Sequence, residues 1–305
     1  MENRILVIAG PTASGKTALS VELAGRLHSE VISADCMSVY RRLNIGTAKP
    51  TEEERRGIVH RMIDIVDPGE PFSVSDYEQK ALPAVDRLHA QGCVPVVCGG
   101  TGFYIQSLLF SRALGSVAGD ASVRAEYEAI AQTQGKERLH ELLREIDPDS
   151  AEKLHPNDVR RVVRALEIYR LTGRKKSEQA DGFVPRFPYL CVAFDHPRER
   201  LYARIDQRVD EMLERGLVEE VRELLDSGVP ENAQCMQGIG YKEVVLYLKN
   251  EISFSTMRDI IQRNTRNYAK RQVTFFKKIP QILWLDPAGK NPEDFILNEL
   301  WKLNR

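Results

Sequence analysis

The stretch GPTASGKT, residues 10–17, constrains the fold of this chain more than any other feature. It matches the pattern G-x-x-x-x-G-K-[ST], follows the apolar run RILVIA and precedes the helix-like segment ALSVELAGRL. In such a loop, glycines let backbone N–H groups converge on phosphate oxygens at a helix N-terminus. Lys16 adds positive charge, and the Thr17 hydroxyl can ligate Mg²⁺. The loop predicts phosphate binding within an α/β fold, and a plain glycine-rich turn with an exposed lysine is the weaker alternative.

Apolar runs recur along the chain with helical segments between most of them. Buried strands are predicted at residues 4–9, 30–35, 61–67, 93–100 and 189–195, with a last strand-like piece at 281–286. Residues 73–92 are an example of the helical segments between them. Strands that alternate with helices predict a parallel sheet with right-handed crossovers. The expected fold class is α/β, a P-loop NTPase-like parallel sheet flanked by helices.

The pattern changes near Gly119, where helical periodicity replaces the strand runs. In residues 157–173, Asn157 is a predicted N-cap and Gly173 a predicted helix end. The apolar stripe of this helix comprises Val159, Val162, Val163 and Leu166. We therefore expect an all-helical insertion domain over residues 118–185, between a first core part, 1–117, and a second core part with C-terminal helices, 186–305.

Bulk composition excludes several classes of protein. The formal net charge of the 305 residues is −1, so a nucleic-acid partner would need a local basic patch. The five cysteines are scattered without a CxxC pair, and the six histidines form no metal-binding pattern. Residues 92–111 lack charge, but Pro95 and the GGTG turn interrupt them. With no signal-peptide pattern at the N-terminus, we expect a cytoplasmic protein without a membrane segment.

Two polar residues are predicted at the carboxyl ends of strands. Asp35 follows the second strand, at the edge of the sheet where α/β proteins bind ligands, and can serve as a general base, a metal ligand or merely a helix cap. Thr101 lies within GGTGFY, where the glycines either bring its hydroxyl to a ligand or simply form a turn. Asp67 and Asp195 also end predicted strands, so the position of a metal-binding acid stays open.

Arginines cluster on three predicted helices. Like charges spaced four residues apart destabilise a helix by roughly 0.2–0.5 kcal/mol per pair. The residues concerned are Arg200, Arg204 and Arg208, which either face an anion or are neutralised by Asp206, Asp210 or Glu211. Arg160, Arg161 and Arg164 lie opposite the apolar stripe of the insert, and Arg263, Arg266 and Lys270 share a C-terminal face with Tyr268 and Phe275 interleaved. These faces suit either contacts with RNA or plain solvation. The two aromatic residues suit either stacking on bases or packing in the core.

Several blocks together resemble the tRNA dimethylallyltransferases, the tRNA isopentenyltransferases of bacterial type. They are GPTASGKT, SADCMSVYRRLNIGTAKP (33–50), GGTGFY, HPNDVRRVVRALEIY, GIGYKE (238–243) and TRNYAKRQVTFFKK, which span residues 10 to 278. The resemblance implies transfer of a five-carbon group from dimethylallyl diphosphate to N6 of the adenosine 3′-adjacent to the tRNA anticodon. It also implies that the loop holds this diphosphate with Mg²⁺, and that the tRNA anticodon stem-loop is the partner.

The same resemblance assigns residues to roles. The implied catalytic residues are Asp35 as the base, Thr101 near the reacting centre, and Lys16. The implied diphosphate ligands are Gly10, Pro11, Thr12, Ala13, Ser14, Gly15, Lys16, Thr17 and Arg208, with Thr17 also the metal ligand. The implied tRNA-binding residues are Asp35, Cys36, Met37, Ser38, Thr101, Arg124, Val159, Arg160, Arg161, Val162 and Val163. Cys36 and Ser38 depart from the expected Ser-Met-Gln, and Ser38 lacks the amide that pairs with adenine.

Two other functions compete with this interpretation. A small-molecule kinase would use Asp35 as the base for an acceptor hydroxyl and would consume ATP. An RNA-binding ATPase would show RNA-stimulated hydrolysis. Neither is excluded by general physics, and a monomer is expected because no association motif is present.

Overall fold

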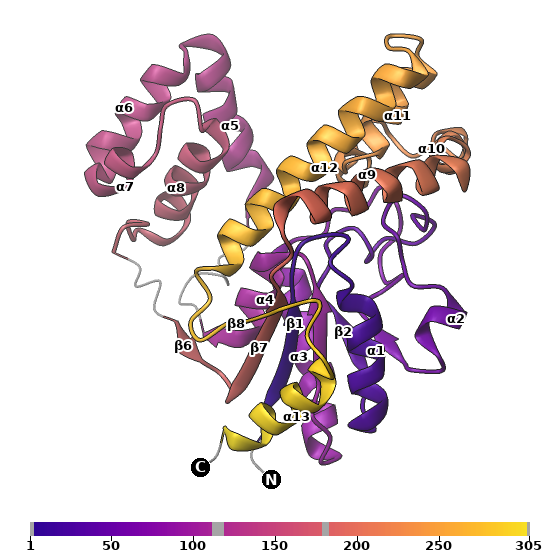
Figure 1. Cartoon of the computed structure of the whole chain (residues 1–305). Helices are drawn as coiled ribbons and strands as arrows, with labels where there is room; N and C mark the ends of the chain where they lie inside the picture. Colours follow the sequence, from indigo (N-terminus) through magenta and orange to yellow (C-terminus); the bar gives the residue numbers. More distant parts are fainter. Residues whose placement is uncertain (1–2, 112–118, 179–182, 304–305) are drawn as a thin grey trace. The chain divides into compact units, whose positions relative to one another are not determined.

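The computed structural model describes residues 3–111, 119–178 and 183–303 (Figure 1). The chain forms two compact units: Met1–Phe110 with Pro185–Arg305 is unit 1, and Ser111–Val184 is unit 2. The sequence predicted an insert over 118–185, of which residues 118 and 179–182 lie outside the described part. The strands β5 (Phe110–Ser111) and β6 (Val184–Pro185) form a separate two-stranded sheet.

Unit 1 is built on a six-stranded sheet with the order β3-β2-β4-β1-β7-β8. Every pairing recorded in it is parallel. The strands are β1 (Ile5–Ala9), β2 (Val31–Ser33), β3 (His60–Arg61), β4 (Val96–Gly99), β7 (Tyr189–Phe194) and β8 (Leu283–Leu285). The central strands are buried on both faces, which explains their unbroken apolar sequences. The predicted parallel α/β architecture is confirmed.

Helices cover both faces of this sheet (Figure 1). On one face Leu6 and Ile8 pack with α1 (Lys16–Arg26) and α13 (Pro292–Lys302). On the other face Ile5 and Val7 belong to a larger core. That core draws on α3 (Val74–Ala90), α4 (Gly102–Leu109), α9 (Arg198–Glu214), α10 (Leu217–Asp226), η1 (Gln234–Gln237), α11 (Tyr241–Leu248) and α12 (Phe254–Phe276). Alternate residues of one strand thus stabilise two separate layers. The short helix α2 (Glu52–Arg55) lies in the β2–β3 connection.

The strand predicted at 61–67 is wrong beyond its first residue. β3 ends at Arg61, and of the remaining residues Val66 forms only an isolated bridge with Tyr40. Met62 and Asp64 adopt left-handed φ values of 64° and 56°, which a strand does not accommodate. The apolar pattern of this segment therefore reflects burial in a loop.

Unit 2 is helical over its described residues. It contains α5 (Ala121–Thr133), α6 (Lys136–Ile146), α7 (Pro148–Lys153) and α8 (Val159–Thr172) around a core that includes Leu139, Leu143, Val162 and Leu166. Gly173 ends α8 in the left-handed conformation, as predicted. The predicted N-cap Asn157 is wrong: Asp158 takes that position and pairs with Arg161 instead of capping the helix.

No helix of the described chain is both long and apolar enough to cross a bilayer.

Candidate active site

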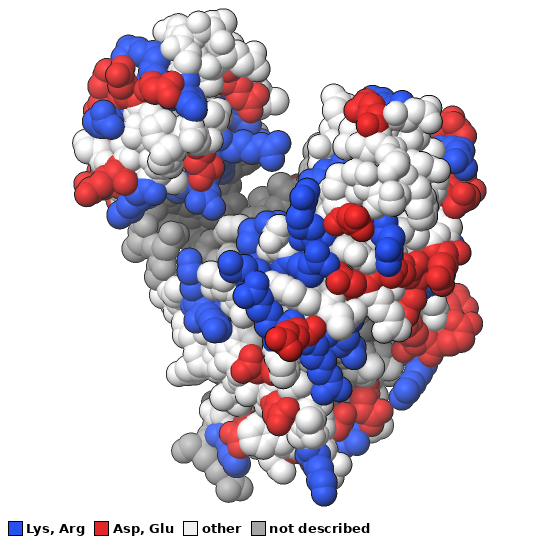
Figure 2. All heavy atoms as spheres, turned by 45° about the horizontal axis from the view of Figure 1, so that its top comes forward, with Lys and Arg blue, Asp and Glu red and all other residues white. Residues whose placement is uncertain are grey.

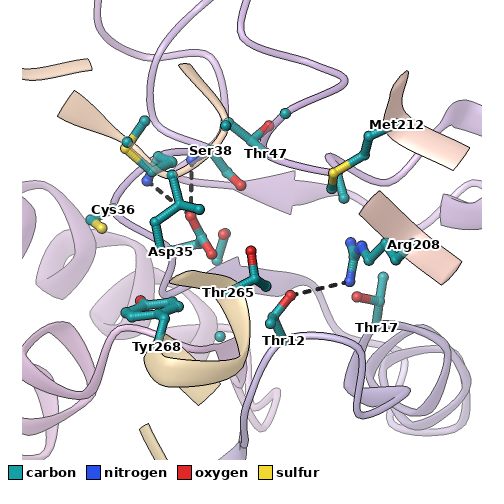
Figure 3. A pocket seen from close by; sticks show the side chains of 18 of the residues that line it. Thr12, Thr17, Asp35, Cys36, Ser38, Thr47, Arg208, Met212, Thr265 and Tyr268 are labelled. Atoms are coloured by element: carbon teal, nitrogen blue, oxygen red, sulfur yellow. Dashed lines mark hydrogen bonds between the residues drawn. The ribbon is translucent and has the colours of Figure 1, made fainter. Parts of the chain in front are cut away.

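A pocket of about 500 Å³ opens in unit 1 beside the carboxyl ends of β1 and β2. Its wall includes residues of the 10–17 loop, the segment after β2, the 44–50 segment, α9 and α12. In Figure 3, Thr12, Thr17 and Arg208 lie on one side, and Asp35, Cys36 and Tyr268 on the other. The parallel topology explains this meeting point, because loops that follow parallel strands gather at one edge of the sheet.

The 10–17 loop wraps back on itself ahead of α1. Gly15 has a φ of 92° and Ala13 a φ of 61°, so the chain turns through left-handed positions before the helix begins. The Lys16 ammonium donates to the Pro11 carbonyl at 3.1 Å. Burial lowers the pKa of Lys16, and the nearby Arg208 charge acts in the same direction, whereas the Cys98 and Asp35 acids oppose it. A half-buried cation of this kind gains from an anionic partner in the pocket.

The arginines of α9 contact the 10–17 loop directly. Arg204 donates through Nε to the Ala13 carbonyl at 2.7 Å, and Arg208 donates to the Thr12 hydroxyl at 3.4 Å. The carboxylates considered as neutralising partners are engaged elsewhere. Asp206 pairs with Arg266, Asp210 with Arg258, and Glu211 accepts from Gln207.

Of Arg200, Arg204 and Arg208, it is Arg208 that lines the pocket. Burial lowers its pKa, opposed chiefly by the charge of Asp35. Among the described residues neither Arg204 nor Arg208 forms an ion pair within α9, although the charge of Glu211 also acts to raise the pKa of Arg208. An arginine held toward the loop is suited to an anionic ligand.

Asp35 follows β2 and faces the same pocket. Its Oδ1 accepts the N–H groups of Met37 and Ser38 at 2.9 and 3.1 Å, so the carboxylate does cap the turn that follows (Figure 3). The cap engages one oxygen and fixes the orientation of the group. Its charge opposes the lowering of the pKa of Lys16 and of Arg208 by burial. Asp35 thus caps a turn, whereas the sequence interpretation considered a helix cap, and its carboxylate lies beside the cations of the loop.

Thr101 does not line the pocket itself. The described residues that line it include Gly99 but not Thr101. Its hydroxyl accepts the N–H of Cys36 at 3.0 Å, and its own N–H donates to the Ala34 carbonyl. Burial raises the pKa of Tyr268, and a hydrogen bond with Thr101 acts against this rise. Thr101 thus connects β4 to the residue next to Asp35.

The glycines around Thr101 serve close approach rather than an unusual turn. None of Gly99, Gly100 and Gly102 has a left-handed φ. A Cβ at Gly99 would lie 2.1 Å from the Ala34 oxygen, and one at Gly102 would lie 2.1 Å from the Phe275 ring. Such separations are far inside van der Waals contact, so only glycine fits at these positions.

Helix α12 contributes pocket residues that the sequence interpretation either missed or, for Tyr268, assigned to RNA stacking or core packing. Thr265, Tyr268, Arg271 and Gln272 line the pocket, although they lie far along the chain from the loop. The stretch TRNYAKRQVTFFKK signalled a basic face, but not that one side of the helix closes the pocket. Tyr268 faces the site (Figure 3), whereas Phe275 packs edge-to-face against Phe103.

The segment of residues 44–48 forms part of the pocket wall opposite α12, and hydrogen bonds to Glu220 hold this segment in place. The Glu220 carboxylate accepts the N–H groups of Asn44, Ile45 and Gly46 at 2.7, 2.7 and 3.1 Å. The Tyr241 hydroxyl donates to the same carboxylate at 2.7 Å. The arrangement gives the tyrosine of the GIGYKE block a structural role. Its ring packs so closely that a Cβ on Gly46 would lie 2.6 Å from it.

The segment after Asp35 forms part of the pocket wall. Ser38 is buried and Cys36 is half-buried, and burial raises the pKa of the Cys36 thiol to about 11. Met37 packs over Gly238, where a Cβ would lie 2.5 Å from its methyl carbon. Gln237 lines the same pocket. Because position 38 is a serine, this part of the wall has no side-chain amide at that position.

The remaining residues assigned to RNA lie in unit 2. Arg160 and Arg161 are exposed, while Val162 and Val163 are buried in the unit's core. The two buried valines therefore serve packing through their side chains, and Val159 is partly buried beside them. Arg124 pairs with the buried Glu167 at 2.9 Å, and Arg164 pairs with the same carboxylate.

Positive charge is unevenly distributed over unit 1. Figure 2 shows Lys and Arg side chains gathered on the side where α9 and α12 lie in Figure 1, next to a strip of acidic residues. Exposed residues of these two helices include Arg200, Arg204, Arg263, Lys270 and Arg271. An overall charge of −1 therefore conceals a locally basic surface.

The fold and the pocket define a class: an α/β protein with a cation-lined pocket at the carboxyl ends of a parallel sheet. The chain belongs to the tRNA dimethylallyltransferase family, since the family model described as IPP transferase matches residues 38–279. A second model, isopentenyl transferase, matches residues 3–70. The resemblance found in the sequence motifs is confirmed.

Relatives match nearly the whole chain. The tRNA dimethylallyltransferase of Acetivibrio thermocellus is 44% identical over 98% of this chain and 96% of its own length. That of Lachnoclostridium phytofermentans is 41% identical, again over 98% of this chain and 96% of its own length.

Solved structures of tRNA-modifying transferases also match nearly the whole chain. The tRNA isopentenylpyrophosphate transferase of Bacillus halodurans superposes with a TM-score of 0.75 at 40% identity, over 99% of this chain and 98% of that one. A eukaryotic dimethylallyltransferase acting on tRNA gives a TM-score of 0.81 at 32% identity, over 97% of this chain and 77% of that one.

Proposed function

We propose that this protein transfers the dimethylallyl group of dimethylallyl diphosphate to N6 of the adenosine 3′-adjacent to the anticodon of tRNA. Membership of the tRNA dimethylallyltransferase family supports the reaction. The observation that carries the proposal is the position of Asp35, an oriented carboxylate in one pocket with Lys16 and Arg208. A base and an anion-stabilising set at one site are what alkyl transfer from a diphosphate requires.

The 10–17 loop would receive the diphosphate, in a core of P-loop NTPase-like kind. As the allylic C1–O bond breaks, its electron pair passes to the diphosphate oxygen. Lys16, the loop N–H groups and Arg208 would stabilise the negative charge that develops there. The leaving group is then the diphosphate, and ATP has no part in the reaction.

Thr17 would hold the cofactor Mg²⁺. Among the described residues no cluster of three or more His, Cys, Asp or Glu side chains suits a metal ion. The Thr17 hydroxyl lines the pocket and makes no hydrogen bond to other described residues. One hydroxyl fits a cation that keeps several waters and takes its other ligands from phosphates. When bound, Mg²⁺ supplies further neutralisation of the diphosphate charge.

Asp35 would act as the base toward the adenine amine. The N6 lone pair is delocalised into the ring, so the amine becomes an effective nucleophile only as its proton leaves. That proton passes to the carboxylate while the new N6–C1 bond forms. Thr101 would support the step by holding the Cys36 N–H next to Asp35.

The adenine must leave the anticodon-loop stack to reach the pocket, at a cost of a few kcal/mol. The segment Cys36-Met37-Ser38 would lie beside the flipped base. Arg124 and residues 159–163 of unit 2, the proposed insertion domain, would contact the anticodon stem-loop, with Arg160 and Arg161 directed to phosphates. We further propose that the protein works as a monomer in the cytoplasm, where its free cysteines stay reduced.

Nucleoside mass spectrometry tests the reaction. Unmodified tRNA with an adenosine after the anticodon is incubated with the protein, Mg²⁺ and dimethylallyl diphosphate, and in parallel with Mg²⁺ and ATP alone. A dimethylallyl mass gain on adenosine that requires the diphosphate donor supports the proposal. ATP consumption without this gain would contradict it in favour of a kinase or an RNA-stimulated ATPase.

A further inference from the structure

The buried amide of Gln272 joins two loops of the pocket. Gln272 lies on α12 with 5% of its surface exposed. Its Oε1 accepts the Thr12 N–H at 3.1 Å, and its Nε2 donates to the Gly100 carbonyl at 2.8 Å. An N–H only donates and a carbonyl only accepts, so both partners fix the same orientation of the amide.

Position 100 is shaped around this contact. A Cβ on Gly100 would lie 2.3 Å from Gln272 Nε2, so any larger residue would displace the amide. Thr12 belongs to the 10–17 loop, and its hydroxyl also meets Arg208. Gly100 precedes Thr101, which holds the Cys36 N–H. One side chain therefore connects the loop that carries the cations to the segment that carries the carboxylate.

We propose that Gln272 is a positioning residue, which holds the 10–17 loop in its ligand-receiving conformation through Thr12 and in register with Asp35 through Gly100. The identity of the ligand as a diphosphate rests on the proposed function. Gln272 acts through the loop, because its two amide ends are engaged by backbone groups.

Removing the amide leaves the Thr12 N–H and the Gly100 carbonyl without their partner. The loop is then released from the fixed arrangement of its N–H groups, and an anion bound there has to reorder it. In Gln272→Met we expect the dissociation constant for inorganic diphosphate with Mg²⁺ to rise about tenfold, which corresponds to about 1.4 kcal/mol.

Gln262 provides a matched control on the same helix. It is 9% exposed, and its Nε2 donates to the Asp206 carbonyl and the Asp210 carboxylate. It does not line the pocket among the described residues. Gln262→Met removes an equally buried amide and should lower stability similarly, while leaving diphosphate affinity unchanged. Calorimetric titration and chemical denaturation of both variants separate positioning from packing.

Gln272→Glu adds a pH-dependent test. Burial raises the pKa of a carboxyl group, and a protonated carboxyl has one acceptor oxygen and one O–H donor, as the amide does. The ionised form lacks the donor for the Gly100 carbonyl. The ratio of its dissociation constant to that of the wild type should fall toward one as the pH is lowered from about 8 to about 5.5. The corresponding ratio for Gln272→Met should stay constant.

Hydrogen exchange of residues 10–16 supplies a readout that needs no ligand. We expect faster exchange of this segment in Gln272→Met than in Gln262→Met. Equal exchange in the two variants, equal effects on diphosphate affinity, or a pH-independent ratio for Gln272→Glu would each overturn the proposal. A wild-type protein that binds diphosphate but modifies no tRNA would contradict the proposed function alone.

Discussion

The hydroxyl of Thr101 accepts the backbone N–H of Cys36 at 3.0 Å, across two loops that follow different strands of the sheet. The contact places the end of β4 against the residue next to Asp35. Thr101→Val keeps the shape but removes the acceptor, so we expect transfer to slow by about 10- to 100-fold through misplacement of Asp35. Thr101→Ser retains a hydroxyl and should restore most of the rate. Steady-state kinetics with both variants check this, and equal losses would indicate a packing role for the threonine.

Replacement of Asp35 separates its two functions. The carbonyl oxygen of Asn can still accept the Met37 and Ser38 N–H groups, so Asp35→Asn should keep the turn and the affinity for tRNA. Without a base, transfer should fall by a factor of about 10²–10⁴. Asp35→Ala should in addition lose about 1 kcal/mol of stability with the cap. Single-turnover rates, tRNA binding and denaturation distinguish these effects, and a fully active Asp35→Asn would remove Asp35 from the role of base.

Glu220 is expected to determine the position of the 44–48 segment. An amide at this position turns an NH₂ group toward backbone donors, so Glu220→Gln should lower the free energy of unfolding by about 1–3 kcal/mol. The neighbouring Glu219 pairs only loosely with Arg222, at 3.7 Å, and is exposed. Glu219→Gln should therefore change stability by less than about 0.5 kcal/mol. Urea denaturation of both variants is the measurement, and matching midpoints would contradict the anchoring role.

Glu167 should make the stability of unit 2 sensitive to acid. Burial acts to raise the pKa of Glu167, but hydrogen bonds from Arg164, the Asp120 N–H and Arg124 hold it below its ordinary value of 4.5. The unfolded carboxyl thus binds a proton more readily than the folded one. The stabilisation is complete above about pH 4.5 and is lost as the pH falls through the lower folded pKa.

Glu167→Gln should flatten this decline, whereas the exposed Glu126→Gln should leave it unchanged. Hydrogen exchange of residues 119–178 as a function of pH tests the difference. A decline of the same steepness in Glu167→Gln and the wild type would show that Glu167 does not cause it.

Arg160 and Arg161 are expected to meet RNA phosphates. Each replacement by Gln should weaken tRNA binding and reduce the slope of log affinity against log salt by about one unit. Arg138, also in unit 2, pairs with Glu141 and Glu145, and Arg138→Gln is the matched control. Filter binding over a range of salt concentrations gives the slopes. Slopes unchanged from the wild type would assign both arginines to a solvated face.

Local patterns in the sequence were sufficient for five of the six predicted strands, for the turn at residues 10–17 and for the helices of residues 119–178. Glycine spacing, apolar runs and helical periodicity are properties of neighbouring residues, so they are readable without a structure. The third strand failed because Met62 and Asp64 turn left-handed within an apolar run. The identities of these two residues do not predict that conformation.

Long-range partners could not be predicted in this way. Whether Arg208 faces the loop or an acid of its own helix depends on where Asp206 and Asp210 find their partners, on α12. Glu220 and Gln272 looked like ordinary helix residues, since their partners are backbone groups more than a hundred positions away. Asp35 was the mixed case: its type and position predicted a function, but only the structure shows the cap and the pocket together.

The long sequence separation between Thr12 and Gln272 also bears on how the protein folds during synthesis. The amide that holds Thr12 is synthesised 260 residues after the loop at residues 10–17. Domains generally fold as units during synthesis, at roughly 5–20 residues per second. A nascent chain therefore carries its glycine-rich loop for many seconds before that contact can form, and the pocket is complete only after α12 has been synthesised.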